Sequence, residues 1–274
     1  MCNEAFEKWP FAETCAAIRK AGYTGIEIAP FTLAEKPSDV SAARRRELCD
    51  IMSSEGLAFV GFHWLMASPK GLNVTGPDAE LRGRSWDHIR DLIDLCADLG
   101  PNGVMVFGSP QQRRTSGGLN RAQATCHFVD GFASVAPHAE SRQVTVLVEA
   151  LPIDQCDVVQ TLEEAAAIVR QIGSPAIRTM FDVHNAVDEI EPHSVLVDRY
   201  FDVISHVHVN ELDGKHCGAS TAAPYDFKPL FEVLEHRGYR GWISLETFDF
   251  SFGPERIANE SLRHLESEIA KLNL

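Results

Sequence analysis

The chain alternates short hydrophobic runs with longer amphipathic stretches. The short runs are rich in β-branched and aromatic residues, a composition that predicts β-strands. We expect strands at 24–29, 57–64, 103–108, 144–149, 177–182, 204–209 and 242–246.

Between these runs, apolar residues recur at the spacing of one helix face. One such stripe comprises Trp86, Ile89, Ile93 and Cys96, and others lie within 162–172 and 227–234. This spacing predicts amphipathic helices that cover the strands.

The alternation of strand and helix continues without a composition break or a long linker. Residues 1–6, which precede the first predicted helix, could supply an eighth strand. Eight strand–helix units in a chain of this length predict an α/β fold, a (β/α)8 TIM barrel that spans 1–274 as a single domain. An open doubly wound sheet is the main alternative, but the chain lacks the Gly-rich first turn that usually marks one.

Composition narrows the class of protein further. The 274 residues include 25 basic and 39 acidic side chains, which gives a formal net charge of −14. This balance argues against nucleic acid and membrane surfaces as partners. No run approaches the length of a spanning helix, and the start of the chain lacks a signal-like pattern. The seven cysteines are scattered and form no C-x-x-C pair, so we expect reduced thiols in a cytoplasmic protein.

Ligand-type side chains stand at the ends of the last four predicted strands. They are Glu149, Asp182, His208 and Glu246. The carboxyl ends of barrel strands meet at one mouth, so these side chains should converge. Three buried carboxylates repel one another unless a cation neutralises them, and this donor set suits Mn²⁺, Mg²⁺ or Co²⁺.

Each of these residues also has a structural interpretation. A single carboxylate at a strand end is often a helix cap or part of a salt bridge. For His208 alone, packing beside His206 on the same strand face is the more common role. Four consecutive strands that all end in this way favour a metal site.

Several segments resemble the sugar phosphate isomerase/epimerase family with a xylose isomerase-like TIM barrel. The segments are V-L-V-E (146–149), F-D-V-H-N (181–185), H-V-H-V-N-E (206–211), G-W-I-S-L-E (241–246), G-F-H-W-L (61–65), F-G-S-P-Q-Q-R (107–113) and 151–165. The family includes ketose 3-epimerases, hydroxypyruvate isomerase and inosose dehydratase, with endonuclease IV as a distant relative.

The resemblance implies roles for the four strand-end residues. Glu149, Asp182, His208 and Glu246 would bind a divalent metal, with Mn²⁺ expected and Mg²⁺, Co²⁺ or Zn²⁺ as alternatives. Glu149 and Glu246 would also form the acid/base pair. A metal that binds a ketone and its neighbouring hydroxyl stabilises the enediolate formed when one carboxylate removes the proton between them. Return of a proton then completes an epimerisation or an isomerisation of a small sugar.

Two other functions use the same residues. An inosose-type dehydratase loses water after the same proton abstraction, and a non-catalytic barrel binds a sugar without turnover. The endonuclease IV function is disfavoured because it needs more histidines and a surface that tolerates DNA. Related barrels are often dimers or tetramers, so a homo-oligomer is compatible with the resemblance.

Further residues are candidates for contacts with the substrate. His63, Trp64, His184, Gln111 and Arg113 lie at or just beyond strand ends. A packed core position is an equal alternative for His63 and Trp64, and a surface position is an equal alternative for Arg113.

Three more features lie near the expected mouth. Glu211 is expected to be solvated or to support the ligands, and 66–78 could form a lid. Ketose 3-epimerases carry an arginine near the loop 213–218, where this chain offers only Lys215. That departure argues against a strict tagatose-type 3-epimerase.

Overall fold

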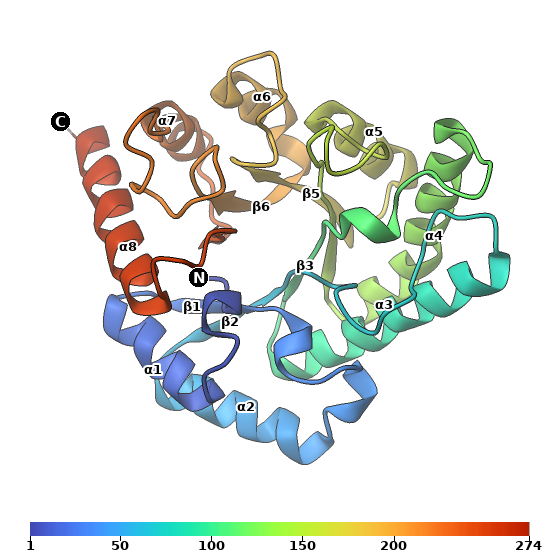
Figure 1. The fold of residues 1–274 in the computed structure, drawn as a ribbon, viewed down its shortest axis with the longest axis horizontal. Helices are drawn as coiled ribbons and strands as arrows, with labels where there is room; N and C mark the ends of the chain where they lie inside the picture. Colours follow the sequence, from blue (N-terminus) through green and yellow to red (C-terminus); the bar gives the residue numbers. More distant parts are fainter. Residues whose placement is uncertain (274) are drawn as a thin grey trace.

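Parallel strands form the centre of the molecule, as Figure 1 shows for this computed structural model, which describes residues 1–273. In sheet order the strands are β1 (Gly25–Ile28), β2 (Ala58–Phe62), β3 (Val104–Phe107), β4 (Thr145–Val148), β5 (Ile177–Asp182), β6 (Ile204–Val209) and β7 (Ile243–Leu245). Every strand expected from the hydrophobic runs is confirmed, with ends that differ by at most two residues.

Helices form a ring around the strands (Figure 1). They are α1 (Phe11–Ala21), α2 (Ala42–Ser54), α3 (Ala79–Leu99), α4 (Arg121–Ser141), α5 (Leu162–Ile172), α6 (His193–Tyr200), α7 (Lys228–His236) and α8 (Pro254–Ala270). The stripe of Trp86, Ile89, Ile93 and Cys96 is buried on α3, as its spacing predicts. None of the helices in residues 1–273 is both long and apolar enough to cross a membrane.

The N-terminal segment nearly closes the barrel between β7 and β1. The Cys2 N–H donates to the Leu245 carbonyl at 2.9 Å, and the Asn3 N–H donates to the Glu27 carbonyl at 2.9 Å. Cys2 pairs with Glu27 as an isolated parallel bridge, and a 3-10 turn begins at Glu4. The eighth strand expected within residues 1–6 is therefore reduced to a short extended segment, and the fold is a single-domain TIM barrel.

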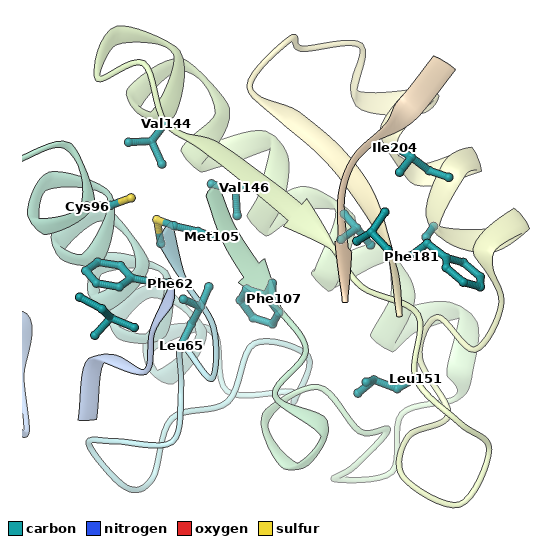
Figure 2. Close-up of a cluster of buried hydrophobic side chains, with 14 of the residues drawn as sticks. Phe62, Leu65, Cys96, Met105, Phe107, Val144, Val146, Leu151, Phe181 and Ile204 are labelled. Atoms are coloured by element: carbon teal, nitrogen blue, oxygen red, sulfur yellow. The ribbon is translucent and has the colours of Figure 1, made fainter. Parts of the chain in front are cut away.

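Side chains alternate along each strand between the helix layer and the barrel interior, because successive residues of a strand point to opposite faces. The outer faces join the helices in one large apolar cluster, part of which Figure 2 shows around Met105, Phe107 and Val146. A smaller apolar cluster, separate from it, comprises Val60, Val104, Val106, Leu147 and Met180. The same alternation leaves polar residues, including Glu27, His206 and His208, at the inward positions of the remaining strands.

Candidate active site

The barrel brings together the four residues expected at its mouth. Glu149 directly follows β4, Asp182 ends β5, His208 lies in β6, and Glu246 directly follows β7. One ligand atom from each lies within 4.8 Å of the corresponding atom of every other. All four side chains are buried.

Direct contacts orient these side chains. His208 Nδ1 lies 3.0 Å from Glu246 Oε2 and 3.4 Å from Asp182 Oδ2. Asn185 Nδ2 donates to Glu149 Oε1 at 2.9 Å, and its backbone N–H donates to Asp182 Oδ1 at 2.8 Å. The loop after β5 therefore connects two of the carboxylates.

Glycine at position 108 makes room for the Glu149 carboxylate. A Cβ at this position would lie 2.2 Å from Glu149 Oε2, which is far inside contact distance. Any other residue here would displace the carboxylate from the cluster.

The cluster is electrostatically unfavourable without a cation. Burial, together with the negative charges of Glu246 and Asp182, raises the pKa of Glu149 to about 8. Burial also raises the pKa of Glu246. Burial disfavours the charged form of Asp182 as well, but contacts with His208 and the Asn185 N–H lower its pKa.

The residues present fit a divalent metal ion. Three carboxylates and one imidazole provide the oxygen and nitrogen donors that such ions prefer, and they already converge. The pKa of Glu149 is raised because its carboxylate is buried beside other negative charges. A bound cation would offset those charges and lower this pKa.

A buried glutamate beneath the cluster supports His208. The Nε2 atom of His208 donates to Glu27 Oε1 at 3.0 Å, and Nε2 of His206 donates to Glu27 Oε2 at 2.8 Å. All three side chains are fully buried. Burial opposes ionisation of Glu27, but the two imidazoles hold its pKa well below the usual range. An ionised Glu27 fixes the Nε2 proton of His208, so Nδ1 is the atom that would be available to bind a metal ion.

Glu27 was not among the site residues expected from the sequence, although its place in β1 carries a signal. Glu27 is the only charged residue of β1, where all four positions are buried. Charged side chains are almost never fully buried without a partner, so a charged residue in this strand indicates a hydrogen-bonding partner on another strand. That partner is the pair His206 and His208, which lie on the same face of β6.

A cavity of about 360 Å³ opens above the carboxylates. Six of the residues expected from the sequence line it: His63, Trp64, Gln111, Glu149, His184 and Glu246. Asn185 and Arg114 also line the cavity and were not expected from the sequence. Asn185 Oδ1 is buried and has no hydrogen-bond partner among the described residues.

Arg113 does not reach the cavity, which corrects the expectation of a substrate contact. Its side chain is fully buried, and its guanidinium donates to the carbonyls of Glu149 at 2.7 Å and Phe107 at 3.3 Å. These contacts join the ends of β3 and β4 below the mouth. The neighbouring Arg114 is the arginine that lines the cavity.

Burial of Glu211 excludes one of the two roles expected for it, a solvated surface group. Glu211 is fully buried rather than solvated, and it accepts hydrogen bonds from the backbone N–H groups of Gly218 and Tyr225. It therefore shapes the loop after β6. Lys215 is exposed and paired with Asp213 at 2.6 Å, and it does not line the cavity.

The segment 66–78 is partly anchored rather than free. Val74 and Thr75 are fully buried. The Val74 N–H donates to the Gln112 carbonyl at 2.8 Å, and the Thr75 hydroxyl donates to the Arg114 carbonyl at 2.9 Å. The second half of this segment thus supports the loop after β3, which carries Gln111 and Arg114.

The chain belongs to the family described as xylose isomerase-like TIM barrel, which matches residues 15–268. Among curated relatives, the ketose 3-epimerase of Arthrobacter globiformis is 22% identical over 86% of this chain and 78% of that protein. The 2-oxo-tetronate isomerase of Cupriavidus necator is 24% identical over 46% of this chain, a match that spans about half (49%) of that relative.

Solved structures show the same fold at low sequence identity. D-psicose 3-epimerase from Clostridium cellulolyticum H10 superposes with a TM-score of 0.81 at 17% identity, over 96% of this chain and 94% of that one. The 3-keto-D-glucoside 4-epimerase of E. coli also superposes with a TM-score of 0.81, at 18% identity over 97% and 98% of the two chains.

Proposed function

We propose that this protein is a divalent-metal-dependent isomerase or epimerase of a small sugar or sugar derivative. The observation that carries the proposal is the convergence of Glu149, Asp182, His208 and Glu246, two of which, Glu149 and Glu246, line a cavity of sugar size. Its membership of the sugar isomerase and epimerase group is supported by the ketose 3-epimerase and isomerase relatives.

Glu149 and Glu246 act as the acid/base pair in this proposal. Both line the cavity, and they approach it from β4 and β7, two strands that are not neighbours. A cation held beside them would polarise a substrate carbonyl and favour loss of the adjacent carbon-bound proton. Burial raises the pKa of both side chains in the metal-free protein. With a metal bound, each would take or return a proton through a carboxylate oxygen that the metal does not hold.

Other side chains of the cavity bind and orient the sugar. The free Oδ1 atom of Asn185 is available to accept a hydrogen bond from a sugar hydroxyl, since its amide nitrogen already contacts Glu149. The Nδ1–H of His184 donates to the Leu212 carbonyl at 2.8 Å, which leaves Nε2 to accept a hydrogen bond from a sugar hydroxyl. Trp64 supplies an apolar wall.

An inosose-type dehydratase is the second candidate function. An inosose dehydratase of Yersinia enterocolitica is 23% identical over 69% of this chain. Dehydration starts from the same proton abstraction, so the four residues serve either reaction. A product lighter than its substrate by one water would identify the dehydratase.

Exchange of solvent deuterium into a panel of ketoses tests the proposal. We expect the metal-loaded protein to exchange the proton next to the carbonyl of at least one ketose, seen by NMR and by mass. Failure to exchange any ketose or inosose by the metal-loaded protein would contradict a proton-abstraction enzyme.

Metal affinity is expected to rise with pH. A metal ligand must be deprotonated, and Glu149 has a pKa of about 8 in the metal-free protein, so below that pH its proton competes with the metal. As the pH is lowered below the pKa of Glu149, the apparent metal affinity should fall by about tenfold per pH unit for each proton that the metal displaces. Isothermal titration calorimetry between about pH 6 and pH 8 in buffers of different ionisation enthalpy measures the proton release. A pH-independent affinity with no proton release would show that Glu149 is already ionised.

A further inference from the structure

A second cavity adjoins the candidate active site. Its volume is about 590 Å³, and its lining comes from the segments that follow β1, β2 and β7 and from the N-terminal segment. Those segments belong to the same end of the barrel as the carboxylate cluster. We refer to this cavity as the aromatic groove because Phe31, Trp64, Phe248 and Phe250 line it.

Only a thin wall separates the aromatic groove from the active-site cavity. Trp64 and Phe248 line both, and their rings meet edge to face with centroids 6.4 Å apart. Nε2 of His63 also donates to Glu4 Oε2 at 2.6 Å. His63 lines the active-site cavity and Glu4 lines the aromatic groove, so this hydrogen bond is a second contact between the two linings. A molecule bound beside the carboxylates therefore needs to extend only past the Trp64 ring to enter the groove.

The backbone holds Trp64 at this boundary in an uncommon conformation. Its φ of 53° lies in the left-handed region, which bulky residues rarely adopt. Such conformations persist where the surrounding structure imposes them, and they cluster at ligand-binding sites. Trp64 remains 36% exposed, so it lies at the surface of the two cavities rather than in the core.

The chemistry of the groove suits a neutral sugar ring. Aromatic faces offer apolar contact to the C–H face of a pyranose, and a few polar groups around them can bind its hydroxyls. The polar lining consists of Glu4, Glu7, Ser68 and Lys70. The carboxylates of Glu4 and Glu7 outnumber the ammonium of Lys70, so the lining has a net negative charge that would repel a phosphate or carboxylate group.

We propose that the aromatic groove binds a second sugar ring, so that the substrate is a glycoside whose ketose unit occupies the active-site cavity. This inference rests on the proposed function and specifies its substrate class as ketose-terminated disaccharides or related glycosides. The continuity of the two cavities at Trp64 and Phe248 is the observation that connects them.

Calorimetric titration of the metal-loaded protein with lactulose and isomaltulose, compared with D-fructose, the ketose unit of both, tests the inference. We expect a disaccharide to bind about tenfold more tightly than its free ketose, the gain that one aromatic contact of this kind provides. Phe250→Ala should bring the ratio of disaccharide to ketose affinity close to one, because Phe250 lines the groove but not the active-site cavity. Its side chain is 45% exposed, so its removal leaves no cavity in the core. Ile190→Ala, at a fully exposed position elsewhere, is the matched control and should leave the ratio unchanged.

Failure of the groove inference and failure of the proposed function give different results in these experiments. Deuterium exchange into a free ketose without any gain for a disaccharide would overturn the groove inference and leave the proposed function in place. An absence of both binding and exchange would overturn the two together. A Phe250→Ala variant that changes the oligomeric state measured by light scattering, but not the affinity ratio, would show that the groove is an interface between copies of the chain.

Discussion

Replacing Glu246 with glutamine is expected to abolish turnover while the barrel remains folded. The amide keeps the shape of the side chain but can neither remove nor return a proton near neutral pH. Loss of a general acid/base group lowers rates by about a hundredfold to ten-thousandfold, and loss of a metal ligand adds to this. The rate of deuterium exchange into the best ketose, compared between variant and native protein at saturating metal, measures the effect.

The matched control for this variant is Glu235→Gln, which removes one carboxylate from the exposed face of α7. It should retain the native exchange rate and the native circular dichroism spectrum. Full activity of Glu246→Gln on the same ketose would contradict the assignment of Glu246 to the acid/base pair.

Replacing Glu27 with alanine is expected to weaken metal binding, although Glu27 is not one of the four proposed metal ligands. The variant removes the acceptor of both His206 and His208, so the proton on His208 Nε2 is no longer fixed. Loss of such a supporting carboxylate typically lowers metal affinity by about tenfold to a hundredfold. Breaking a buried ion pair by removing one partner also costs about 3–5 kcal/mol of stability.

Titration calorimetry separates these two effects, because it measures metal affinity on the folded protein. Glu27→Gln provides the conservative comparison, because it keeps the side-chain volume and one acceptor oxygen. Relative to Glu27→Ala, it should regain more of the lost folding stability than of the lost metal affinity. Glu268→Gln serves as control, since Glu268 is a buried glutamate on α8 that pairs with Lys271 away from the barrel interior. Native metal affinity in both Glu27 variants would show that Glu27 only fills the interior.

The convergence of the four ligand-type residues was predictable because it follows from topology. Once the hydrophobic runs identify parallel strands, residues at their carboxyl ends must meet at one mouth of the barrel. Glu149, Asp182 and Glu246 each stand at the end of such a run, so no knowledge of packing was needed to bring them together.

The support beneath the cluster could not be located in the same way. Glu27 and His208 are 181 positions apart, and their contact depends on the closure of β1 against β6 across the interior. The position of Arg113 depends on loop conformation, since it follows β3 in a turn whose two arginines, Arg113 and Arg114, point to different environments. Local pattern shows that a loop is polar, but it does not show which of its side chains is buried.

Metal content tests the central claim most directly. We expect elemental mass spectrometry of the purified protein to find about one divalent metal ion per chain, and the Glu149→Ala/Asp182→Ala double variant to have lost it. Added Mn²⁺ should raise the unfolding temperature of the metal-stripped native protein but not that of the double variant. A folded native protein that contains no metal and gains no thermal stability from Mn²⁺, Mg²⁺, Co²⁺ or Zn²⁺ would contradict the account. The carboxylates would then be structural, and a sugar-binding barrel without turnover would become the leading function.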